Sequence, residues 1–499
     1  MRLFETAHEK HLAAETAALA YGNPFLEERI VHEQRFLGQQ YVPSEPYWSL
    51  QSDADRKGNV ERITAISARL AATLRDRLAA GAKATDDERA LYEDVVIYVV
   101  YERYRNGFLE LAERGEKGRI AFWPAFRRDL VEFLPERAPD AAHLFACFYQ
   151  VRRAFHHIFT AIVGRSLAAA KLRAAVWQSI FSHDMRRFRR SLHARMADAT
   201  TLITGPTGTG KELVARAIGL SRYLPFDERS ERFAEGSSFV SLNLSALSPT
   251  LLESELFGHR KGAFTGAMHD REGYLESCGE HGTVFLDEIG EVDPAVQVKL
   301  LRVLQNRTFQ RLGDTATRRF RGKIVVATNR DLAAEIARGR FREDFYYRLC
   351  SDTIATPSLD EQLRGEPDEL RHLVRFISAR VAGEEEAAPL TDQVCAAIAG
   401  MRAYRWPGNF RELEQCVRSV MLRGSYTPAA ARPSDARLRI ADDVLRGAFD
   451  ADALLRNYCT LLYAADRNYA RVAARLGIDR RTVKAKVDAA LLEELDGSN

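Results

Sequence analysis

The stretch TLITGPTGTGKELVARAIGL, residues 201–220, decides the fold of this chain. It opens with a β-rich run, continues through a turn that contains Gly205, Gly208 and Gly210, and ends in a helical run. Glycines allow a tight turn whose consecutive backbone N–H groups point inward, and the start of a helix favours bound anions. A strand, a glycine-rich turn and a helix in this order predict a phosphate-binding loop.

We expect this loop to bind ATP, and the expected contacts are Gly205, Pro206, Thr207, Gly208, Thr209, Gly210, Lys211 and Glu212. Lys211 is placed to reach the β- and γ-phosphates. Glu212 stands where such loops usually have a Ser or Thr that binds magnesium. Another residue must therefore supply the protein ligand of Mg²⁺.

The run TVFLDE, residues 283–288, supplies that ligand. It is an apolar strand pattern that ends in the carboxylates of Asp287 and Glu288. Phosphoryl transfer needs a metal ligand and a group that orients the attacking water. We therefore predict that Asp287 holds Mg²⁺ and that Glu288 polarises the water.

Strand patterns alternate with helical stretches after residue 200, and they lie at residues 200–204, 239–242, 283–286 and 323–328. Such alternation predicts a parallel sheet covered by helices on both faces. After Pro357 the pattern is helical again until about Arg423.

Residues 1 to about 175 have helical patterns throughout. The run from Tyr92 to Leu111 contains β-branched residues, but its length and flanking charges favour a helix. A further amphipathic helix is predicted from the spacing of Phe181, Met185, Phe188, Leu192 and Met196. Its arginines, Arg186, Arg187, Arg189 and Arg190, are expected on a solvated face.

The end of the chain predicts a DNA-binding unit. Residues 424–437, GSYTPAAARPSDAR, have the composition of a linker. Two short helices follow around Gly477, which can end the first, while Asp479 can cap the second. Residues Ala473, Leu476, Ile478 and Val483 are spaced to pack the two helices together. The expected DNA contacts on the second helix, which suits the major groove, are Arg480, Arg481, Thr482, Lys484 and Lys486.

Composition sets limits on these interpretations. A chain of 499 residues predicts about three domains. The formal net charge of +3 means that DNA binding must depend on a local basic cluster. The six cysteines show no metal-ligand or paired spacing, which argues against disulfides and structural zinc. The first residues lack an apolar signal-peptide core and no stretch of the first half is long enough to span a membrane, so we expect a cytoplasmic protein.

Between the two phosphate motifs lies the hexapeptide GAFTGA, residues 262–267. On this motif the chain resembles the sigma-54-dependent activators, also called bacterial enhancer-binding proteins, of the AAA+ ATPase superfamily. The resemblance implies a sigma-factor contact by Gly262, Ala263, Phe264, Thr265, Gly266 and Ala267. Its glycines and alanines predict a mobile loop with an aromatic tip.

The resemblance covers roughly residues 177–425 and the C-terminus, and it implies further roles. Asn243 matches the switch residue that restrains the catalytic Glu288, and Asn329 matches the sensor after the fourth strand. Arg342 and Arg348 match the arginines that reach the ATP of a neighbouring subunit, and Arg411 matches the second sensor, which faces the phosphates. The chain departs from the family at residues 356–362, TPSLDEQ, where a Pro-Pro-Leu-Arg run is usual.

We therefore expect a multidomain protein: an all-α N-terminal regulatory domain at 1–175, an α/β P-loop AAA+ subdomain at 176–355 with a helical lid at 356–425, a linker at 426–440, and an all-α helix-turn-helix of Fis type at 441–499. The family implies ATP hydrolysis in a ring, dimers assembling to hexamers, that opens promoters by remodelling sigma-54 RNA polymerase holoenzyme from upstream double-stranded DNA sites. The alternative is a DNA-binding AAA+ regulator that does not engage sigma-54, and relatives of that kind lack an intact hexapeptide. Residues 1–175 show no receiver or strand-rich ligand-sensor pattern, and the neighbouring His156 and His157 are a weak indication of a metal.

Overall fold

A computed structural model describes the chain except for residues 44, 50–55, 116–117, 236–237, 402–403, 429–435, 446, 448 and 497–499. The described residues form two compact units, Met1–Ser425 and Tyr426–Asn499, and we describe each unit by itself. None of the helices in this described part has both the length and the apolar character needed to cross a membrane.

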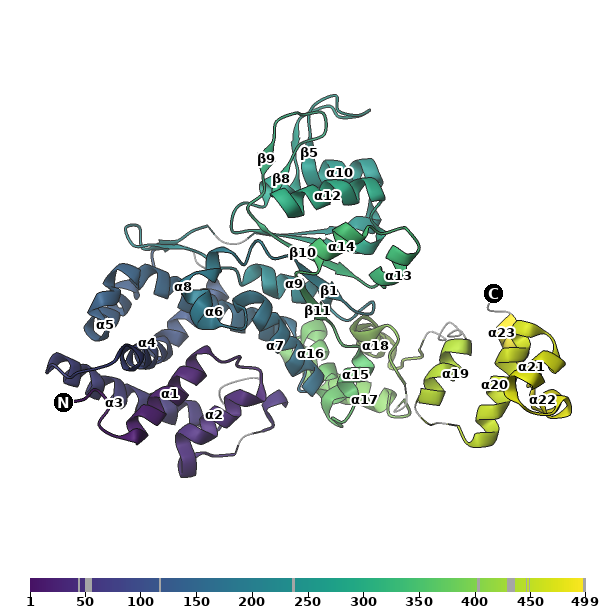
Figure 1. Ribbon diagram of the computed structural model, residues 1–499, viewed down its shortest axis with the longest axis horizontal. Helices are drawn as coiled ribbons and strands as arrows, with labels where there is room; N and C mark the ends of the chain where they lie inside the picture. The colour runs from purple at the N-terminus through teal and green to yellow at the C-terminus, as the bar shows by residue number, and fades with distance from the viewer. Residues whose placement is uncertain are drawn as a thin grey trace. The chain divides into compact units, whose positions relative to one another are not determined.

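The first unit begins with a helical part (Figure 1). Its α-helices are α1 (Ala7–Tyr21), α2 (Glu27–Leu37), α3 (Asn59–Ala79), α4 (Asp86–Arg114), α5 (Trp123–Phe133), α6 (Ala141–Ala161), α7 (Leu167–Phe181) and α8 (Met185–Arg190). Helix α4 starts with a capping box in which the side chains of Thr85 and Glu88 each bond the other's backbone N–H. It contains the whole β-branched run, so the prediction of a helix there is confirmed.

The single amphipathic helix predicted for residues 181–196 is wrong. Helix α7 ends at Phe181, and Ser182 follows with a φ of +64°. A left-handed residue cannot continue an α-helix, so the chain turns before α8 begins at Met185. Phe188 is still buried, because α8 packs on the unit with a new orientation.

One arginine of α8, Arg189, is half-buried and not on a solvated face, whereas Arg186 is exposed as expected. Arg186 forms an ion pair with Asp94 of α4, and Arg189 forms one with Glu93 at 2.9 Å. Both guanidinium groups also lie over the ring of Tyr21. These contacts fix α8 to helices that lie far away in the sequence, which is why spacing alone did not indicate them.

A five-stranded parallel sheet forms the centre of the first unit, in the order β11–β1–β10–β7–β4. The strands are β1 (Thr201–Thr204), β4 (Phe239–Asn243), β7 (Thr283–Asp287), β10 (Lys323–Thr328) and β11 (Asp352–Ala355). Strands β7 and β10 are almost continuously buried, as expected for a parallel sheet covered on both faces. Two-stranded hairpins lie outside the sheet, formed by β2 (Phe226–Asp227) with β3 (Arg232–Phe233), β5 (Gly258–His259) with β6 (Arg271–Glu272), and β8 (Thr308–Phe309) with β9 (Arg318–Arg319).

Helices complete the first unit. Those of the α/β part are α9 (Lys211–Leu220), α10 (Pro249–Phe257), α11 (Tyr274–Ser277), α12 (Pro294–Asn306), α13 (Leu332–Ala337) and α14 (Glu343–Leu349). The predicted helical stretch after Pro357 contains α15 (Leu359–Leu363), α16 (Glu369–Ala382), α17 (Glu384–Ala397) and α18 (Asn409–Arg423), which we call the lid.

The N-terminal helices share their core with the α/β part. Leu224, Phe226 and Phe233 belong to the same buried cluster as residues of α1, α3, α4, α5 and α6. Helices α6 and α7 lie between the other N-terminal helices and the sheet (Figure 1), and α6 packs directly on α9. The helix that follows the phosphate loop is therefore in contact with the N-terminal part.

The second unit contains helices only among its described residues: α19 (Ala436–Leu445), α20 (Ala451–Asp466), α21 (Tyr469–Leu476), α22 (Arg480–Lys486) and α23 (Ala489–Asp496). Gly477 has a φ of +64° and ends α21, and the Asp479 side chain accepts a hydrogen bond from the backbone N–H of Arg481 at 2.7 Å. Both predicted caps are confirmed. Val472, Ala473 and Val483 are buried together, with Leu476 and Ile478 packed against them.

The predicted linker lies partly outside the described residues, since 429–435 are not described. Helix α19 begins at Ala436, within the last residues of that stretch. The predicted fold class is confirmed: helical terminal regions accompany a central α/β fold with a parallel sheet.

Candidate functional site

The loop between β1 and α9 fits tightly against its neighbours. Gly205 and Gly208 have φ angles of +145° and +81°. A Cβ on Gly205 would lie 2.1 Å from Thr356 Oγ1, and a Cβ on Gly208 would lie 2.3 Å from the carbonyl oxygen of Gly408. Only glycine fits these positions, so the end of β11 and the lid both hold the loop in place.

Lys211 begins α9 and is mostly buried. Its Nζ donates hydrogen bonds to the carbonyl oxygens of Gly205 at 3.0 Å and Pro206 at 3.1 Å. Burial lowers the pKa of this ammonium group, and the nearby carboxylates of Glu288 and Asp287 oppose that effect. The charge of Lys211 is therefore held at the loop, where it can meet an anion.

Asp287 and Glu288 end β7, beside the loop. Glu288 has a left-handed backbone with a φ of +57°, and its N–H donates to Asp287 Oδ1 at 3.0 Å. A non-glycine residue in this conformation costs of order 1–3 kcal/mol, which the surrounding fold must offset. The Oε2 atom of Glu288 is buried and accepts no hydrogen bond from the described part of the chain. A buried acceptor of this kind is available for a water molecule.

Asn243 lies opposite Asp287 in the register of β4 and β7. Its Oδ1 accepts hydrogen bonds from the N–H of Ser245 at 3.0 Å and from Ser245 Oγ at 2.8 Å. The side-chain oxygen therefore caps the short turn after β4. The expected restraint of Glu288 by Asn243 stays a prediction, although the two residues line the same cavity.

Asn329, just after β10, contacts the loop directly. Its Nδ2 donates to Thr207 Oγ1 at 3.0 Å. The contact is possible because β10 lies next to β1 in the sheet, so the carboxyl ends of both strands meet at one edge. The proposed sensor is therefore within reach of any phosphate in the loop.

The lid contacts the loop through a residue that the sequence did not single out. Asn409 Nδ2 donates to the carbonyl oxygen of Thr207 at 3.0 Å, and Asn409 Oδ1 accepts from the N–H of Leu359 at 2.8 Å. The N–H of Phe410 donates to the carbonyl oxygen of Gly208 at 3.0 Å. A φ of +53° at Asn409 makes this possible, and Asn tolerates such a backbone better than most residues. Asn in a turn before a helix was the only available signal.

These groups line one cavity of about 630 Å³, which we call the nucleotide cavity. Its polar part contains Thr207, Gly208, Thr209, Gly210, Lys211, Glu212, Asn243, Asp287, Glu288, Asn329 and Arg411. Its apolar part contains Ala161, Ile162, Val163, Leu172, Leu373, Phe376 and Ile377, from α6, α7, their connection and the lid. The arrangement suits a molecule with phosphates at one end and a flat base at the other. The apolar part was not predicted, because helices remote in sequence supply it.

Arg342 and Arg348 do not line the nucleotide cavity of their own chain within the described residues. Arg342 precedes α14 and forms an ion pair with Asp344 at 2.8 Å. Arg348 lies on the same helix, and both side chains are exposed. The structure therefore presents these arginines on the surface.

The GAFTGA hexapeptide forms a compact turn near β5. The N–H of Gly262 donates to the carbonyl oxygen of Ala267 at 2.8 Å, which closes the turn. The ring of Phe264 lies 5.0 Å from that of His259 and is half-buried, whereas Thr265 is exposed. The aromatic side chain is thus packed at the base of the turn, and Thr265 is the more accessible of the two.

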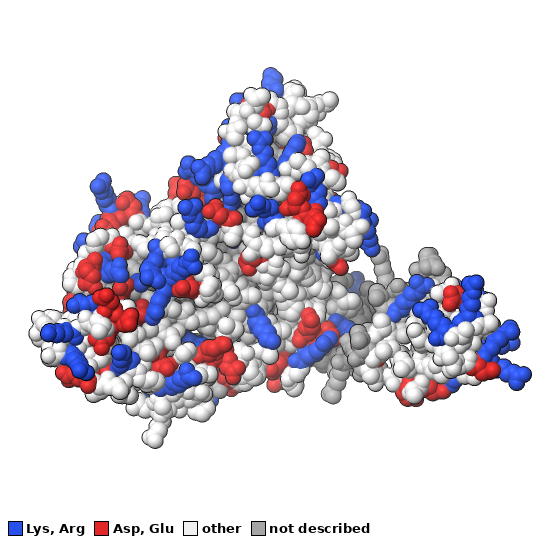
Figure 2. All heavy atoms as spheres, in the orientation of Figure 1, with Lys and Arg blue, Asp and Glu red and all other residues white. Residues whose placement is uncertain are grey.

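Helix α22 carries the basic residues predicted to contact DNA. The side chains of Arg480, Arg481, Thr482 and Lys484 are exposed. Lys486 is half-buried and forms an ion pair with Asp452 of α20. Figure 2 shows Lys and Arg side chains on the visible face of this unit. Lys486 therefore differs from the other predicted contacts, since it already has a partner.

Comparison with known proteins agrees with this geometry. Residues 180–355 match the family described as "Sigma-54 interaction domain". The chain is 47% identical over 226 residues to the Nif-specific regulatory protein of Azotobacter vinelandii, which covers 45% of this chain and 40% of that one. It is 42% identical over 309 residues to the transcriptional regulatory protein ZraR of Klebsiella oxytoca. That match covers 58% of this chain and 63% of ZraR. The chain therefore spans about two fifths to three fifths of the length of these relatives.

Among solved structures, the chain is similar to NtrX from Brucella abortus in complex with ATP. The sequence identity is 25% and the TM-score is 0.40, with 72% of this chain and 77% of that chain covered.

Proposed function

Because residues 180–355 match the family described as "Sigma-54 interaction domain", we propose that this chain is an ATP-driven transcriptional activator of sigma-54 RNA polymerase. The observation that carries the proposal is the single cavity lined by Lys211, Asp287, Glu288, Asn329 and Arg411. The intact hexapeptide belongs to the same compact unit, so hydrolysis and sigma-factor contact can be coupled within one body. A cytoplasmic location follows from this role.

ATP is the substrate. Backbone N–H groups of the loop and Lys211 hold the β- and γ-phosphates, and the apolar part of the cavity receives the base. Water attacks the γ-phosphorus while the bond to the bridging oxygen breaks, and ADP leaves with that oxygen. The free Oε2 of Glu288 orients this water and accepts its proton. Asn329 and Arg411 contact the γ-phosphate.

The residues present fit a magnesium ion. Asp287 Oδ1 accepts the N–H of Glu288, which leaves the other carboxylate oxygen of Asp287 as the protein ligand. Mg²⁺ held by Asp287 would neutralise phosphate charge during the transfer. Glu212 is on the first turn of α9 and does not replace a Ser or Thr in this role.

The active assembly is a ring, formed as dimers join into a hexamer. Arg342 and Arg348 are exposed and lie outside the nucleotide cavity of their own chain. An arginine supplied by a neighbouring subunit stabilises the charge that develops during phosphoryl transfer. Each site is therefore completed by the next subunit.

The second unit binds double-stranded DNA at sites upstream of the promoter. Arg480, Arg481, Thr482 and Lys484 of α22 are free to contact phosphates and base edges in the major groove. Lys486 is the weakest of the five candidates, because binding DNA would cost its ion pair with Asp452.

The experiment that tests the proposal uses Thr265→Ala. Thr265 is exposed on the hexapeptide turn and is not among the residues that line the nucleotide cavity. We expect the variant to bind ATP and to keep most of its hydrolysis, but to lose open-complex formation with purified sigma-54 polymerase. Nucleotide state can act on sigma-54 only through groups that touch both.

The readout compares wild type and Thr265→Ala, each trapped with ADP–aluminium fluoride, for binding of free sigma-54. Met268→Ala is the control, because Met268 is exposed next to the turn and outside the hexapeptide. Promoter opening at the normal rate by Thr265→Ala would contradict the assignment of the sigma-factor contact to the hexapeptide. No promoter opening by the wild type would support the alternative, a DNA-binding AAA+ regulator that does not engage sigma-54.

A further inference from the structure

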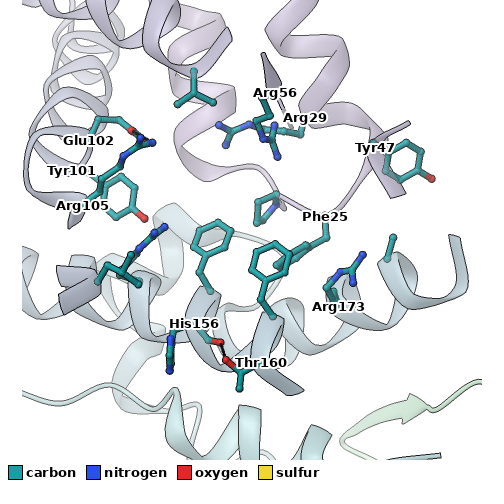
Figure 3. A pocket seen from close by; sticks show the side chains of 17 residues that line it. Phe25, Arg29, Tyr47, Arg56, Tyr101, Glu102, Arg105, His156, Thr160 and Arg173 are labelled. Carbon is teal, nitrogen blue, oxygen red and sulfur yellow. Dashed lines mark hydrogen bonds and ion pairs between the residues drawn. The ribbon is translucent and has the colours of Figure 1, made fainter. Parts of the chain in front are cut away.

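A second cavity, of about 390 Å³, lies in the helical N-terminal part of the first unit. We call it the arginine cavity, and residues of α2, α4, α6 and α7 line it together with residues near the start of α3. Figure 3 shows Arg29 and Arg56 entering from one side, with Arg105 on another helix and Arg173 opposite. Neither the phosphate motifs nor the hexapeptide contributes to it.

The lining is strongly basic, with the arginines Arg29, Arg56, Arg105, Arg152 and Arg173. Three of them have carboxylate partners. Arg29 and Arg56 both pair with Glu33, whose side chain is fully buried, and Arg105 pairs with Glu102 at 3.0 Å. Each of these three guanidinium groups therefore already has a carboxylate partner, although Arg29 and Arg56 share one.

Arg152 and Arg173 have no carboxylate within ion-pair distance in the described part of the chain. Arg173 is only 1% exposed, and its guanidinium donates to the carbonyl oxygens of Ile162, Gly164 and Trp48. The Nε atoms of both arginines are buried and have no hydrogen-bond partner among the described residues. Burial lowers the pKa of Arg173 to about 10, so the group remains charged at neutral pH. The Glu369 carboxylate opposes this effect on Arg173 from beyond ion-pair distance. A buried charge that lacks a direct carboxylate partner gains most from an anion that pairs with it.

Aromatic rings stand directly beside the two unpaired charges. The guanidinium carbon of Arg152 lies 6.0 Å from the centre of the Phe155 ring, and that of Arg173 lies 5.7 Å from the centre of the Phe159 ring. Phe25 joins both rings, at 5.8 Å from Phe155 and 5.4 Å from Phe159. The cavity thus offers flat apolar walls next to two planar cations.

From this arrangement we infer that the arginine cavity binds a small organic anion with a flat apolar body, of which an aromatic carboxylate is the simplest example. The carboxylate pairs with Arg152, whose planar guanidinium matches its two oxygens, and Arg173 adds a second positive charge to the wall of the same cavity. The ring of the ligand packs among Phe25, Phe155 and Phe159. The cavity volume lies at the lower end of the range for small-molecule sites, which suits a metabolite of one or two rings.

Arg173 also connects this cavity to the nucleotide cavity. It holds the carbonyl oxygen of Ile162 at 3.2 Å, and Ile162 lines the apolar part of the nucleotide cavity. The segment between α6 and α7, which contains Ile162, also contacts the lid. The N–H of Arg165 in this segment donates to both carboxylate oxygens of Glu369 on α16. An anion that draws Arg173 toward itself therefore changes the wall against which the base of ATP packs. This coupling, unlike the binding itself, rests on the proposed function.

The test of binding uses 1-naphthoate as the probe, with the full chain, by isothermal titration calorimetry. We expect saturable binding of one probe per chain, at least tenfold weaker binding of the neutral 1-naphthalenemethanol, and at least tenfold weaker binding of 1-naphthoate to Arg152→Gln. Arg69→Gln is the control, since Arg69 is exposed on α3 away from the cavity, and it should bind like the wild type. The inference would be overturned if 1-naphthoate showed no saturable binding, or if the neutral compound bound as tightly as 1-naphthoate. It would also be overturned if inorganic phosphate bound and 1-naphthoate did not.

The test of coupling measures the affinity of a fluorescent ATP analogue with and without saturating 1-naphthoate. We expect at least a threefold change, and linkage requires an equal change in 1-naphthoate affinity when the ATP analogue is present. Arg173→Lys, checked for folding by circular dichroism, keeps the charge but cannot hold Ile162 and Gly164 in the same way, so the change should disappear. An undiminished change in Arg173→Lys, or none in the wild type, would overturn the coupling. The calorimetric result needs no ATP, so it stays informative if the ATPase proposal fails.

Discussion

Different sides of the same two helices, α6 and α7, help to line the nucleotide cavity and the arginine cavity. Of two neighbouring residues of α6, Ala161 lines the nucleotide cavity and Thr160 lines the arginine cavity. On α7, Leu172 lines the nucleotide cavity and Arg173 lines the arginine cavity. Successive residues of a helix point about 100° apart, so one helix can serve two sites.

The two cavities differ in how far the sequence indicates them. The phosphate end of the nucleotide cavity depends on backbone geometry, and a backbone that binds phosphate requires glycines at fixed spacings. The arginine cavity depends on side chains from Arg29 to Arg173 that only the tertiary fold brings together. A site made of backbone can be found by motif, whereas a site made of scattered side chains needs the structure.

The largest effect should come from removing an arginine that, in the proposed ring, completes the nucleotide cavity of the neighbouring subunit. We predict that Arg342→Ala lowers the ATPase kcat by about 10³-fold or more, because in the proposed ring its guanidinium reaches the ATP of the neighbouring subunit. Mixing Arg342→Ala with Lys211→Ala should restore part of the activity, since some interfaces then combine intact parts. A steady-state phosphate-release assay over a range of mixing ratios measures this.

Arg338→Ala is the matched control for Arg342. Arg338 lies on the same stretch, is exposed, and pairs with Glu335 at 3.2 Å. Its loss should leave kcat within a few-fold of the wild type. Equal effects of the two substitutions, or no recovery in any mixture that still assembles, would mean that each nucleotide cavity works alone, as the arginine cavity does.

Two further substitutions in the nucleotide cavity should distinguish the binding of ATP from its hydrolysis. Glu288→Gln is expected to bind ATP normally and to lose about 10²–10⁴-fold in kcat, the range for a general base. Lys211→Ala is expected to lose affinity for ATP instead, because its ammonium group contacts phosphate. Equilibrium binding of a fluorescent ATP analogue and steady-state turnover distinguish the two. Near-normal turnover in both variants would contradict the assignment of this cavity.

Much of the fold was predictable because its signals are local. The runs that became β1, β7 and β10 are apolar and are followed by glycine, acidic or polar residues that mark strand ends. The caps at Gly477 and Asp479 depend on their own backbone, so they too could be predicted.

What could not be predicted depends on partners distant in sequence. The pairing of Arg186 with Asp94 and of Arg189 with Glu93 crosses more than ninety residues, and no spacing rule indicates it. The break at Ser182 follows from the same packing, since helical spacing of apolar residues continues past it. The hydrogen bonds of Asn409 likewise reach residues far away in the sequence, Leu359 within the lid and Thr207 in the phosphate loop.

A third effect concerns the two parts that contain these cavities, and how much the stability of the α/β part depends on the N-terminal helices. Removing residues 1–170 takes away α1 to α6, against which Leu224, Phe226 and Phe233 pack. We predict a loss of at least about 3 kcal/mol in the free energy of unfolding, because burying one such side chain contributes about 1.5–3 kcal/mol. Chemical denaturation of the two proteins measures it. Removal of residues 426–499 is the control, since they form their own compact unit, and a similar loss there would argue against a specific role of the shared core.

The smallest effect should come from Asn409, which bonds the loop of the nucleotide cavity but is not among the residues that line that cavity. Asn409→Gly keeps the left-handed backbone but removes the side-chain bonds to Thr207 and Leu359. Its cost should be about 1–3 kcal/mol, the range for losing buried hydrogen-bond partners. Asn409→Ala adds the strain of a Cβ at a φ of +53°, a further cost of about 1 kcal/mol. Chemical denaturation gives both differences, and the affinity for a fluorescent ATP analogue should fall in the same order if the lid holds the loop. Equal stability of the alanine variant and the wild type would mean that the lid rests on the loop without holding it, and the nucleotide cavity would then be fixed by its own motif alone.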